Sequence, residues 1–135
     1  MIKWFLKRVD TKSKMKKRIT LFFTLMMFIS CEQSKDEILI GEWINKGRTI
    51  IENGQSWEEE YPDGYFVIYE FSSNNTFKTS LEAKGNWKIS NDSILIIDID
   101  SLQQKFVLTV KSESNIIMTE TRNDIDYIYD FIKKN

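Results

Sequence analysis

The chain contains one cysteine and no histidine, which leaves few side chains able to perform chemistry. Catalysis by Ser-His-Asp or Cys-His groups is excluded for this sequence, as are histidine-based zinc and iron sites. The cysteine, Cys31, follows a basic segment and an apolar run at residues 19–29. This position, directly after such a run, is typical of a residue that carries lipid.

Only carboxylate or lysine chemistry remains for an enzyme. A glycosidase needs two carboxyl groups about 5 to 9.5 Å apart in a cleft, which a small domain with short loops rarely forms. Calcium needs six to eight oxygen ligands, and paired aspartates supply too few. No glycine-rich phosphate loop is present. We therefore predict no enzymatic activity, no metal and no cofactor, although carboxylates occur in groups at Glu58, Glu59, Glu60 and Asp63, at Asp98 and Asp100, and at Asp124 and Asp126.

The first thirty residues have the pattern of an export signal. Eight basic residues and one acidic residue precede an apolar run of eleven residues, which is too short to span a bilayer as a helix. Small Ser30 precedes Cys31, so the segment FISC resembles the lipobox of bacterial lipoproteins, with Phe28 in the place of the usual leucine. We predict that Cys31 is the lipid-attachment site and that its acyl chains bind the protein to a membrane.

Two other interpretations of this leader remain open: an uncleaved anchor helix, and an ordinary signal peptide beside an incidental cysteine. Met15 offers an alternative start that would give a leader of more usual length. Residues 31–38 are polar and aperiodic, which predicts a flexible tether. The expected location is the cell envelope, as an outer-membrane lipoprotein, and Lys35-Asp36-Glu37 is similar to a signal for display at the cell surface rather than in the periplasm.

The remainder of the chain is acidic. Beyond residue 30 there are 11 basic and 19 acidic residues, which argues against nucleic acid and anionic lipid surfaces as partners. Since no second cysteine is available for a disulfide, residues 39–135 must be stabilised by core packing. The length of this segment predicts a single domain.

The sequence pattern of that domain predicts an all-β fold. Apolar residues alternate with polar ones, as at Tyr65, Val67, Tyr69 and Phe71, and turn residues separate the runs. Some runs are apolar on both faces, so we predict a small antiparallel up-and-down barrel of about eight strands, with a two-sheet sandwich as the alternative. The expected strands are residues 42–51, 65–72, 76–81, 85–90, 93–98, 105–111, 115–121 and 127–133.

Several aromatic residues are expected inside this barrel. Gly41 allows close approach of the chain, and Trp43 then plugs one end of the barrel, while Trp87 does the same on a middle strand. Eight strands enclose a space that side chains can fill or that can hold one small molecule. The side chains available for it are Trp43, Tyr65, Tyr69, Phe71, Phe77, Trp87, Phe106, Tyr127, Tyr129 and Phe131.

Three segments resemble the lipocalin-like lipoproteins of Bacteroidetes: LIGEWI at residues 39–44, YEFSSNNTF at 69–77 and GNWKISNDSIL at 85–95. Asn75 replaces the commoner turn glycine, and Asn86 replaces the commoner threonine. The resemblance covers most of the domain and implies a lipocalin-like barrel that holds a small apolar ligand.

The longest segment expected to be irregular is residues 53–64, NGQSWEEEYPDG, which we expect over the open end of the barrel. It combines apolar contact surface with acidic groups, so we predict it as the binding surface. One hypothesis is a small hydrophobic ligand beneath this loop. The other hypothesis is a protein partner that binds to the rim of a barrel with a packed interior. The residues expected to bind are Trp57, Glu58, Glu59, Tyr61, Tyr65 and Tyr69.

Overall fold

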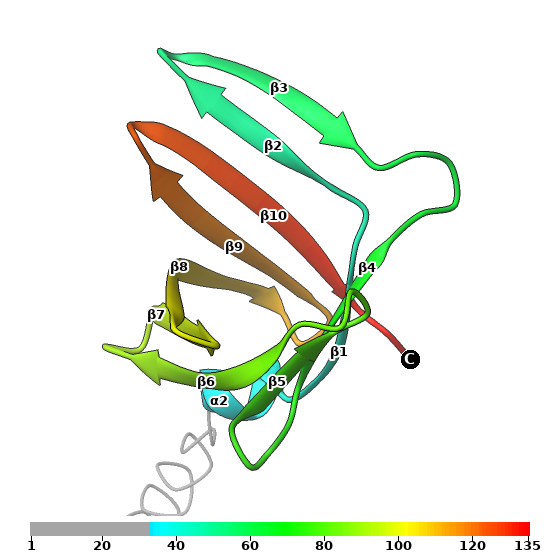
Figure 1. Cartoon of the computed structure of the whole chain (residues 1–135), viewed down its shortest axis with the longest axis vertical. Coiled ribbons are helices and arrows are strands. Elements are labelled where there is room, and N and C mark those ends of the chain that lie inside the picture. The colour runs from blue at the N-terminus through cyan, green and yellow to red at the C-terminus, as the bar shows by residue number, and fades with distance from the viewer. Residues whose placement is uncertain (1–32) are drawn as a thin grey trace, which may run out of the picture. The chain divides into compact units, whose positions relative to one another are not determined.

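The computed structural model describes residues 33–135, so the predicted lipid site Cys31 and the leader lie outside the described residues. Antiparallel strands make up most of this part of the chain (Figure 1). They are β1 (Gly41–Asn45), β2 (Gly47–Glu52), β3 (Gln55–Glu60), β4 (Val67–Phe71), β5 (Thr76–Thr79), β6 (Lys84–Ser90), β7 (Ile94–Ile99), β8 (Leu102–Ser112), β9 (Asn115–Arg122) and β10 (Ile125–Lys133), preceded by the short helix α2 (Lys35–Leu39).

Eight of these strands close into a barrel. The order is β1-β4-β5-β6-β7-β8-β9-β10, and β10 pairs with β1 to complete the ring. Neighbours in this ring are hydrogen-bonded on both sides, which removes the open edges that an apolar sheet would offer to aggregation. The prediction of a small all-β barrel is confirmed.

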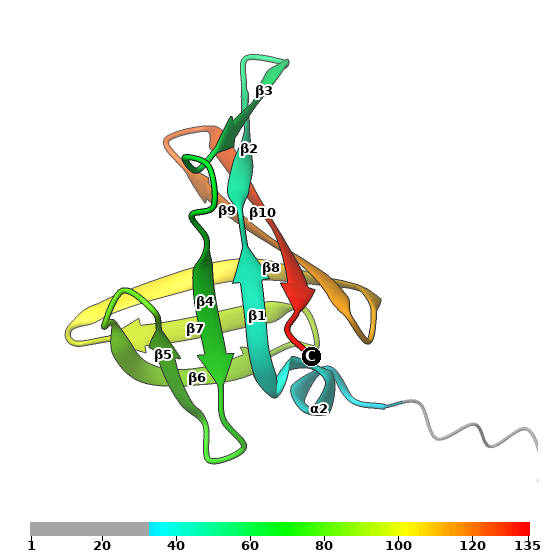
Figure 2. The same ribbon diagram turned by 90° about the vertical axis from the view of Figure 1, so that its right-hand side faces the viewer.

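The segment expected to be one strand at residues 42–51 is divided into β1 and β2 at Lys46. Long strand β10 pairs with both parts: Phe131 lies opposite Asn45 of β1, and Tyr127 lies opposite Ile50 of β2. Buried Asn45 secures the junction, because its side-chain amide donates to the carbonyls of Gly47 at 2.7 Å and Asp130 at 3.0 Å. The wall therefore continues upward through β2 beyond the closed ring (Figure 2).

Residues 53–64 are not irregular throughout, so that prediction is wrong for residues 55–60 and holds for residues 61–64. Gln55–Glu60 is strand β3, which pairs with β2 along its whole length and extends the sheet as a hairpin. The turn is Asn53-Gly54, and both residues have positive φ, 50° and 77°. Asn-Gly is the commonest signal for a two-residue hairpin turn. The strand carries little alternation of polarity because both of its faces are exposed.

The predicted tether is also shorter than residues 31–38, because Lys35–Leu39 is helical. Ser34 caps this helix by accepting a hydrogen bond from the backbone N–H of Glu37 at 3.4 Å. Leu39 is buried in the barrel core, and Nζ of Lys133 donates to the carbonyl of Ile38 at 3.2 Å. The folded domain therefore begins before Leu39, and the helix lies at one end of the barrel (Figure 2).

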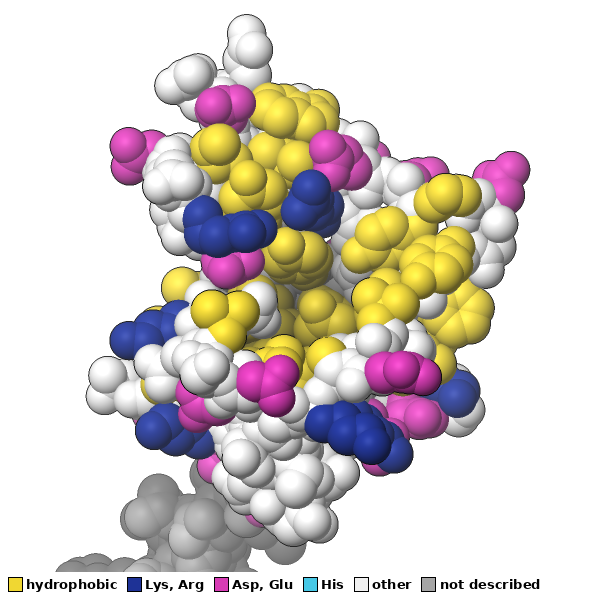
Figure 3. Space-filling view, in the orientation of Figure 1, with side chains coloured by type: hydrophobic (Ala, Val, Ile, Leu, Met, Phe, Trp, Pro, Cys, Tyr) yellow, Lys and Arg dark blue, Asp and Glu magenta, His cyan; other side chains and the backbone are white. Residues whose placement is uncertain are grey.

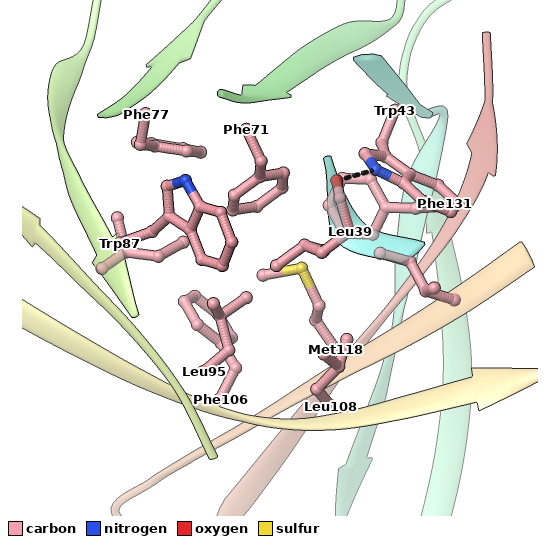
Figure 4. Packing of buried hydrophobic residues seen from close by; sticks show 12 residues of the cluster. Leu39, Trp43, Phe71, Phe77, Trp87, Leu95, Phe106, Leu108, Met118 and Phe131 are labelled. Atoms are coloured by element: carbon pink, nitrogen blue, oxygen red, sulfur yellow. Dashed lines mark hydrogen bonds between the residues drawn. The ribbon is translucent and has the colours of Figure 1, made fainter. Parts of the chain in front are cut away.

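The interior beside this helix is filled with side chains (Figure 4). Phe71 contacts Phe77 with ring centroids 5.1 Å apart and Trp87 edge-on at 5.7 Å. Among the aromatic residues expected inside, Tyr69, Tyr127 and Tyr129 are only partly buried, and Tyr65 is 49 % exposed. The buried cluster consists of Leu39, Trp43, Phe71, Phe77, Trp87, Leu95, Ile97, Phe106, Leu108, Ile116, Met118 and Phe131.

Trp43 joins helix α2 to the barrel. Its indole is fully buried, and Nε1 donates to the carbonyl of Leu39 at 2.7 Å (Figure 4). Gly41 has φ +133°, and a Cβ at that position would lie 2.9 Å from Cε of Lys133, so a side chain there would be strained and crowded. Trp87 is also buried, and its Nε1 donates to the carbonyl of Ser72 at 3.1 Å.

We expect Trp43→Phe to lower the free energy of unfolding by about 1–3 kcal/mol, because it leaves the Leu39 carbonyl without its donor and removes buried volume. Chemical denaturation followed by circular dichroism measures the change. The matched control is Trp57→Phe at an exposed site, which should change stability by less than about 0.5 kcal/mol. Equal effects of the two substitutions would contradict a special role for the Trp43 indole.

Candidate functional site

Residues 61–66 connect β3 to β4 and lie over a hollow in the wall of the barrel. The connection is attached at its start, where the N–H of Tyr61 donates to the carbonyl of Lys46 at 2.9 Å. The rings of Tyr61 and Tyr65 meet edge to face with centroids 5.7 Å apart. The hollow has a volume of about 520 Å³ and is bounded by the connection together with Ile44, Lys46 and Glu60. We call it the loop hollow.

A second hollow adjoins it on the outside of the barrel. Its apolar lining consists of Ile44, Ile117, Ile128 and Ile132, and its volume is about 520 Å³. These isoleucines face outward because they alternate along their strands with inward side chains such as Phe131. We call this space the isoleucine groove. Its rim carries charged residues from β2, β3 and β10, namely Arg48, Glu58, Glu59, Glu60 and Asp130, together with Lys46.

The two hollows share Ile44, Lys46 and Glu60 and so form neighbouring parts of one surface. The sharing follows from the break at Lys46, where β1 ends and β2 carries β3 away from the ring. Ile44 also lies between Ile132 of β10 and Ile68 of β4 in the cross-strand register, so three isoleucines stand side by side on the outer wall. Pockets for small molecules commonly occupy about 300–1,000 Å³ and have mostly apolar linings, and each hollow is within that range.

The inner face of the β2, β9 and β10 extension carries a cluster of charged and aromatic groups, which shares Arg48 and Glu59 with the rim of the isoleucine groove. Nε of Arg48 contacts Oε2 of Glu59 at 2.8 Å, and its guanidinium lies 5.0 Å from the ring centre of Tyr127. Arg122 lies 4.4 Å from the same ring centre and 3.4 Å from Glu120. Figure 3 shows hydrophobic side chains gathered in a hollow on this side of the molecule, with charged side chains around it. Each of these arginines therefore already has a carboxylate partner.

Burial controls the ionisation of the tyrosines between the core and the connection. It raises the pKa of Tyr69 to about 12, with further contributions from Tyr129, Tyr61 and Glu120. Burial also raises the pKa of Tyr61, supported by Tyr129 and opposed by the positive charge of Arg48. Hydrogen bonding to Glu59 and then to Tyr129 raises the pKa of Arg48. At neutral pH both phenols keep their protons and can donate hydrogen bonds.

The structure divides the predicted binding residues between several places. Tyr61 and Tyr65 line the loop hollow, while Glu58 lines the isoleucine groove and Glu59 is paired with Arg48. Trp57 is 41 % exposed and lies opposite Ile50. Tyr69 belongs to the core wall, where its ring lies 4.9 Å from that of Phe131 and 5.3 Å from that of Phe77. The six residues therefore do not form one pocket.

The sequence analysis missed the isoleucines of the groove. Their positions alternate along the sequence with those of inward-facing residues, and this alternation indicates an apolar outer face. The residues are Ile44, Ile117, Ile128 and Ile132. The pattern predicts that both faces of these strands are apolar. It does not predict which outward residues meet across β9, β10 and β1, because that depends on the register.

Two of the other candidate carboxylates have local structural partners. Asp98 accepts a hydrogen bond from Nε2 of Gln103 at 3.0 Å, and Asp126 accepts one from Oγ1 of Thr121 at 2.6 Å. Within residues 33–135, no three of the acidic residues come together in a way that would hold a metal ion. In the same part of the chain, the helices are all too short or too polar to cross a bilayer.

Comparisons of the chain with known protein families, with curated proteins and with solved structures gave no match. A function for this chain must therefore be argued from its own residues and geometry.

We expect the stability of the protein to fall as the pH rises from about 10 through about 12, because the unfolded chain releases the Tyr69 proton first. The folded state holds the proton more tightly, so this contribution is complete below the ordinary pKa of 10.0 and is lost as the folded pKa is passed. Tyr69→Phe removes the contribution. The difference in unfolding free energy between the two proteins, measured by urea denaturation, should therefore narrow across this window. A difference that stays constant with pH would contradict the burial of the phenol.

Proposed function

We propose that this protein is a lipoprotein of the bacterial cell envelope that binds a small apolar ligand at the wall of its barrel. The proposal of ligand binding rests on the loop hollow. It lies beneath residues 61–66, has a volume of about 520 Å³ and places three aromatic side chains, Tyr61, Tyr65 and Phe66, around an apolar floor at Ile44. An apolar ligand in this position would be covered by the connection and would extend toward the isoleucine groove.

The packing of the core favours the wall over the barrel interior as the binding place. Trp43, Phe71, Phe106, Met118 and Phe131 fill the space beside helix α2, and all are at least nine-tenths buried. A ligand in that space would have to displace packed side chains, and interiors at this density resist such changes. The outer hollows need no displacement, since their lining is already exposed or half-buried.

The envelope location rests on the sequence around Cys31. A basic segment, a short apolar run and a small residue before the only cysteine together match the requirements for export and acylation. Since one acyl chain binds a membrane only marginally, two or more chains on Cys31 would be needed for firm attachment. We propose an outer-membrane lipoprotein of lipocalin-like type, facing either the periplasm or the exterior, with no enzymatic activity.

A protein partner is the second candidate. The packed interior and the exposed Trp57, Glu58 and Glu60 on one strand support it. These are the features expected of a barrel that offers its rim as a contact surface.

We expect residues 33–135, which form one compact unit, to bind the apolar probe N-phenyl-1-naphthylamine with an increase in its fluorescence. Ile44→Glu should weaken this binding by at least about tenfold, because it places a carboxylate on the apolar floor that both hollows share. Probe titration measures the affinity, and circular dichroism confirms that the variant is folded.

Ile68→Glu is the matched control. Ile68 also faces outward and is half-buried, and it lies directly opposite Ile44 on the next strand, but it lines neither hollow. The control should bind the probe like the unchanged protein. Absence of binding by the unchanged protein, or equal weakening by both substitutions, would refute the proposed site.

For the anchor, we expect Cys31→Ala to move the protein from the membrane fraction to the soluble fraction after cell fractionation, because it removes the acylated sulfur. Metabolic labelling with a radioactive fatty acid should be lost in the same variant. Continued membrane retention without labelling would identify an uncleaved anchor helix instead.

A further inference from the structure

Among the strands of residues 33–135, β3 is the last in the sheet and has one edge without a partner strand. It pairs with β2 over six residue pairs, from Gly47 opposite Glu60 to Glu52 opposite Gln55, and it is the last strand in the order of the sheet. All six of its residues are exposed. In Figure 1 the hairpin lies beyond β10. The backbone groups on its outer edge are therefore available to another extended chain, because an edge strand presents unused N–H and C=O groups.

The charges on this strand have one sign. Glu58, Glu59 and Glu60 are consecutive, so their side chains alternate between the two faces of the hairpin. Glu59 lies opposite Arg48 and is neutralised by it at 2.8 Å. Glu58 and Glu60 share the other face, and neither forms an ion pair with any residue of the described part of the chain. Two carboxylates thus remain for a cationic group on an added strand.

These charges argue against a second copy of the chain on the same edge. A second β3 strand in parallel register would set its three glutamates opposite the same three glutamates, and like charges directly opposite each other are destabilising. In antiparallel register over residues 55–60 the glutamates would lie opposite Gln55, Ser56 and Trp57, so a second copy would place no cationic group beside Glu58 or Glu60. A strand that carries lysine or arginine has the opposite effect. Trp57 lies on the same face as Glu59, since its partner Ile50 is two residues from Arg48. It is 41 % exposed and offers apolar contact to the same strand.

We propose that the free edge of β3 binds an extended basic segment of a partner protein as an additional antiparallel strand. Main-chain hydrogen bonds supply part of the affinity in this mode of recognition, and alternate side chains supply the specificity. In antiparallel register the partner places basic residues opposite Glu60 and Glu58 and an apolar residue opposite Trp57. Its sequence is therefore basic, any residue, basic, apolar. This interaction uses the main-chain edge of β3, whereas the proposed small ligand lies in the wall hollows, although Glu58 and Glu60 also line those hollows.

The test uses the full-length protein in dodecyl maltoside micelles and the blocked peptide Val-Thr-Arg-Thr-Arg-Leu-Thr-Val. We expect saturable binding by fluorescence anisotropy, and slower amide exchange within residues 55–60 by mass spectrometry. A peptide with N-methyl groups on the amides that would face β3 should lose both effects, because it keeps the charges and removes the donors. Unchanged binding of the N-methylated peptide would show simple charge attraction and would overturn the proposal.

Substitutions test the partner's chemistry. The double variant Glu58→Gln with Glu60→Gln should weaken peptide binding about tenfold, the sum expected for two exposed ion pairs. The control is Glu82→Gln with Glu113→Gln, which removes two exposed carboxylates from turns at other sites and should leave the affinity unchanged. Equal weakening in both double variants would overturn the assignment to β3. Absence of peptide binding would also overturn the proposal. A dimer through β3 would overturn it as well, and it would be detected by sedimentation together with slow amide exchange of residues 55–60 in the absence of peptide.

Discussion

The arrangement of the whole barrel depends on strand β10 pairing with two successive strands. Its end pairs with β1 and closes the ring, and its beginning pairs with β2, which has left the ring. One buried side chain spans the change: Asn45 donates to both Gly47 and Asp130, so it ties the break at Lys46 to β10. A buried amide that makes two hydrogen bonds offsets its loss of water only while both acceptors stay in place. The junction is thereby fixed in one geometry.

The hollows on the wall are a consequence of that junction. Because β2 and β3 leave the ring at Lys46, the outward side chains of β1 and β10 are left beside the hairpin and residues 61–66 instead of on a smooth convex surface. The interior, in contrast, is filled from the helix end by Leu39 and Trp43, which are joined by a short hydrogen bond. The two hollows therefore lie on the outer wall of the barrel, whereas its interior beside the helix is packed. The same hairpin supplies the free edge of β3.

Much of the fold followed from local patterns in the sequence. Alternation at Val67, Tyr69 and Phe71 places one face inward, and the turn residues between runs favour antiparallel neighbours, so the barrel was predictable. The candidate site was predictable only in part. Tyr61 was identified because an aromatic residue stands out in a polar segment, and Tyr65 because it was expected on the inner face of a strand. Strand β3 was missed, since a hairpin with both faces in water shows no alternation of polarity.

The sequence by itself determined the composition of the barrel: its strands, the aromatic residues for its core, an acidic net charge and one cysteine without a partner. These properties depend on residue type and on neighbours along the chain. The tertiary structure alone decided that Ile44, Ile117, Ile128 and Ile132 share a groove. It also decided that Arg48 neutralises Glu59, while Glu58 and Glu60 form no ion pair within residues 33–135. Those relations depend on strand register and on the break at Lys46. A shift of one residue in pairing reverses the face of every side chain in a strand, so the chain order alone does not define them.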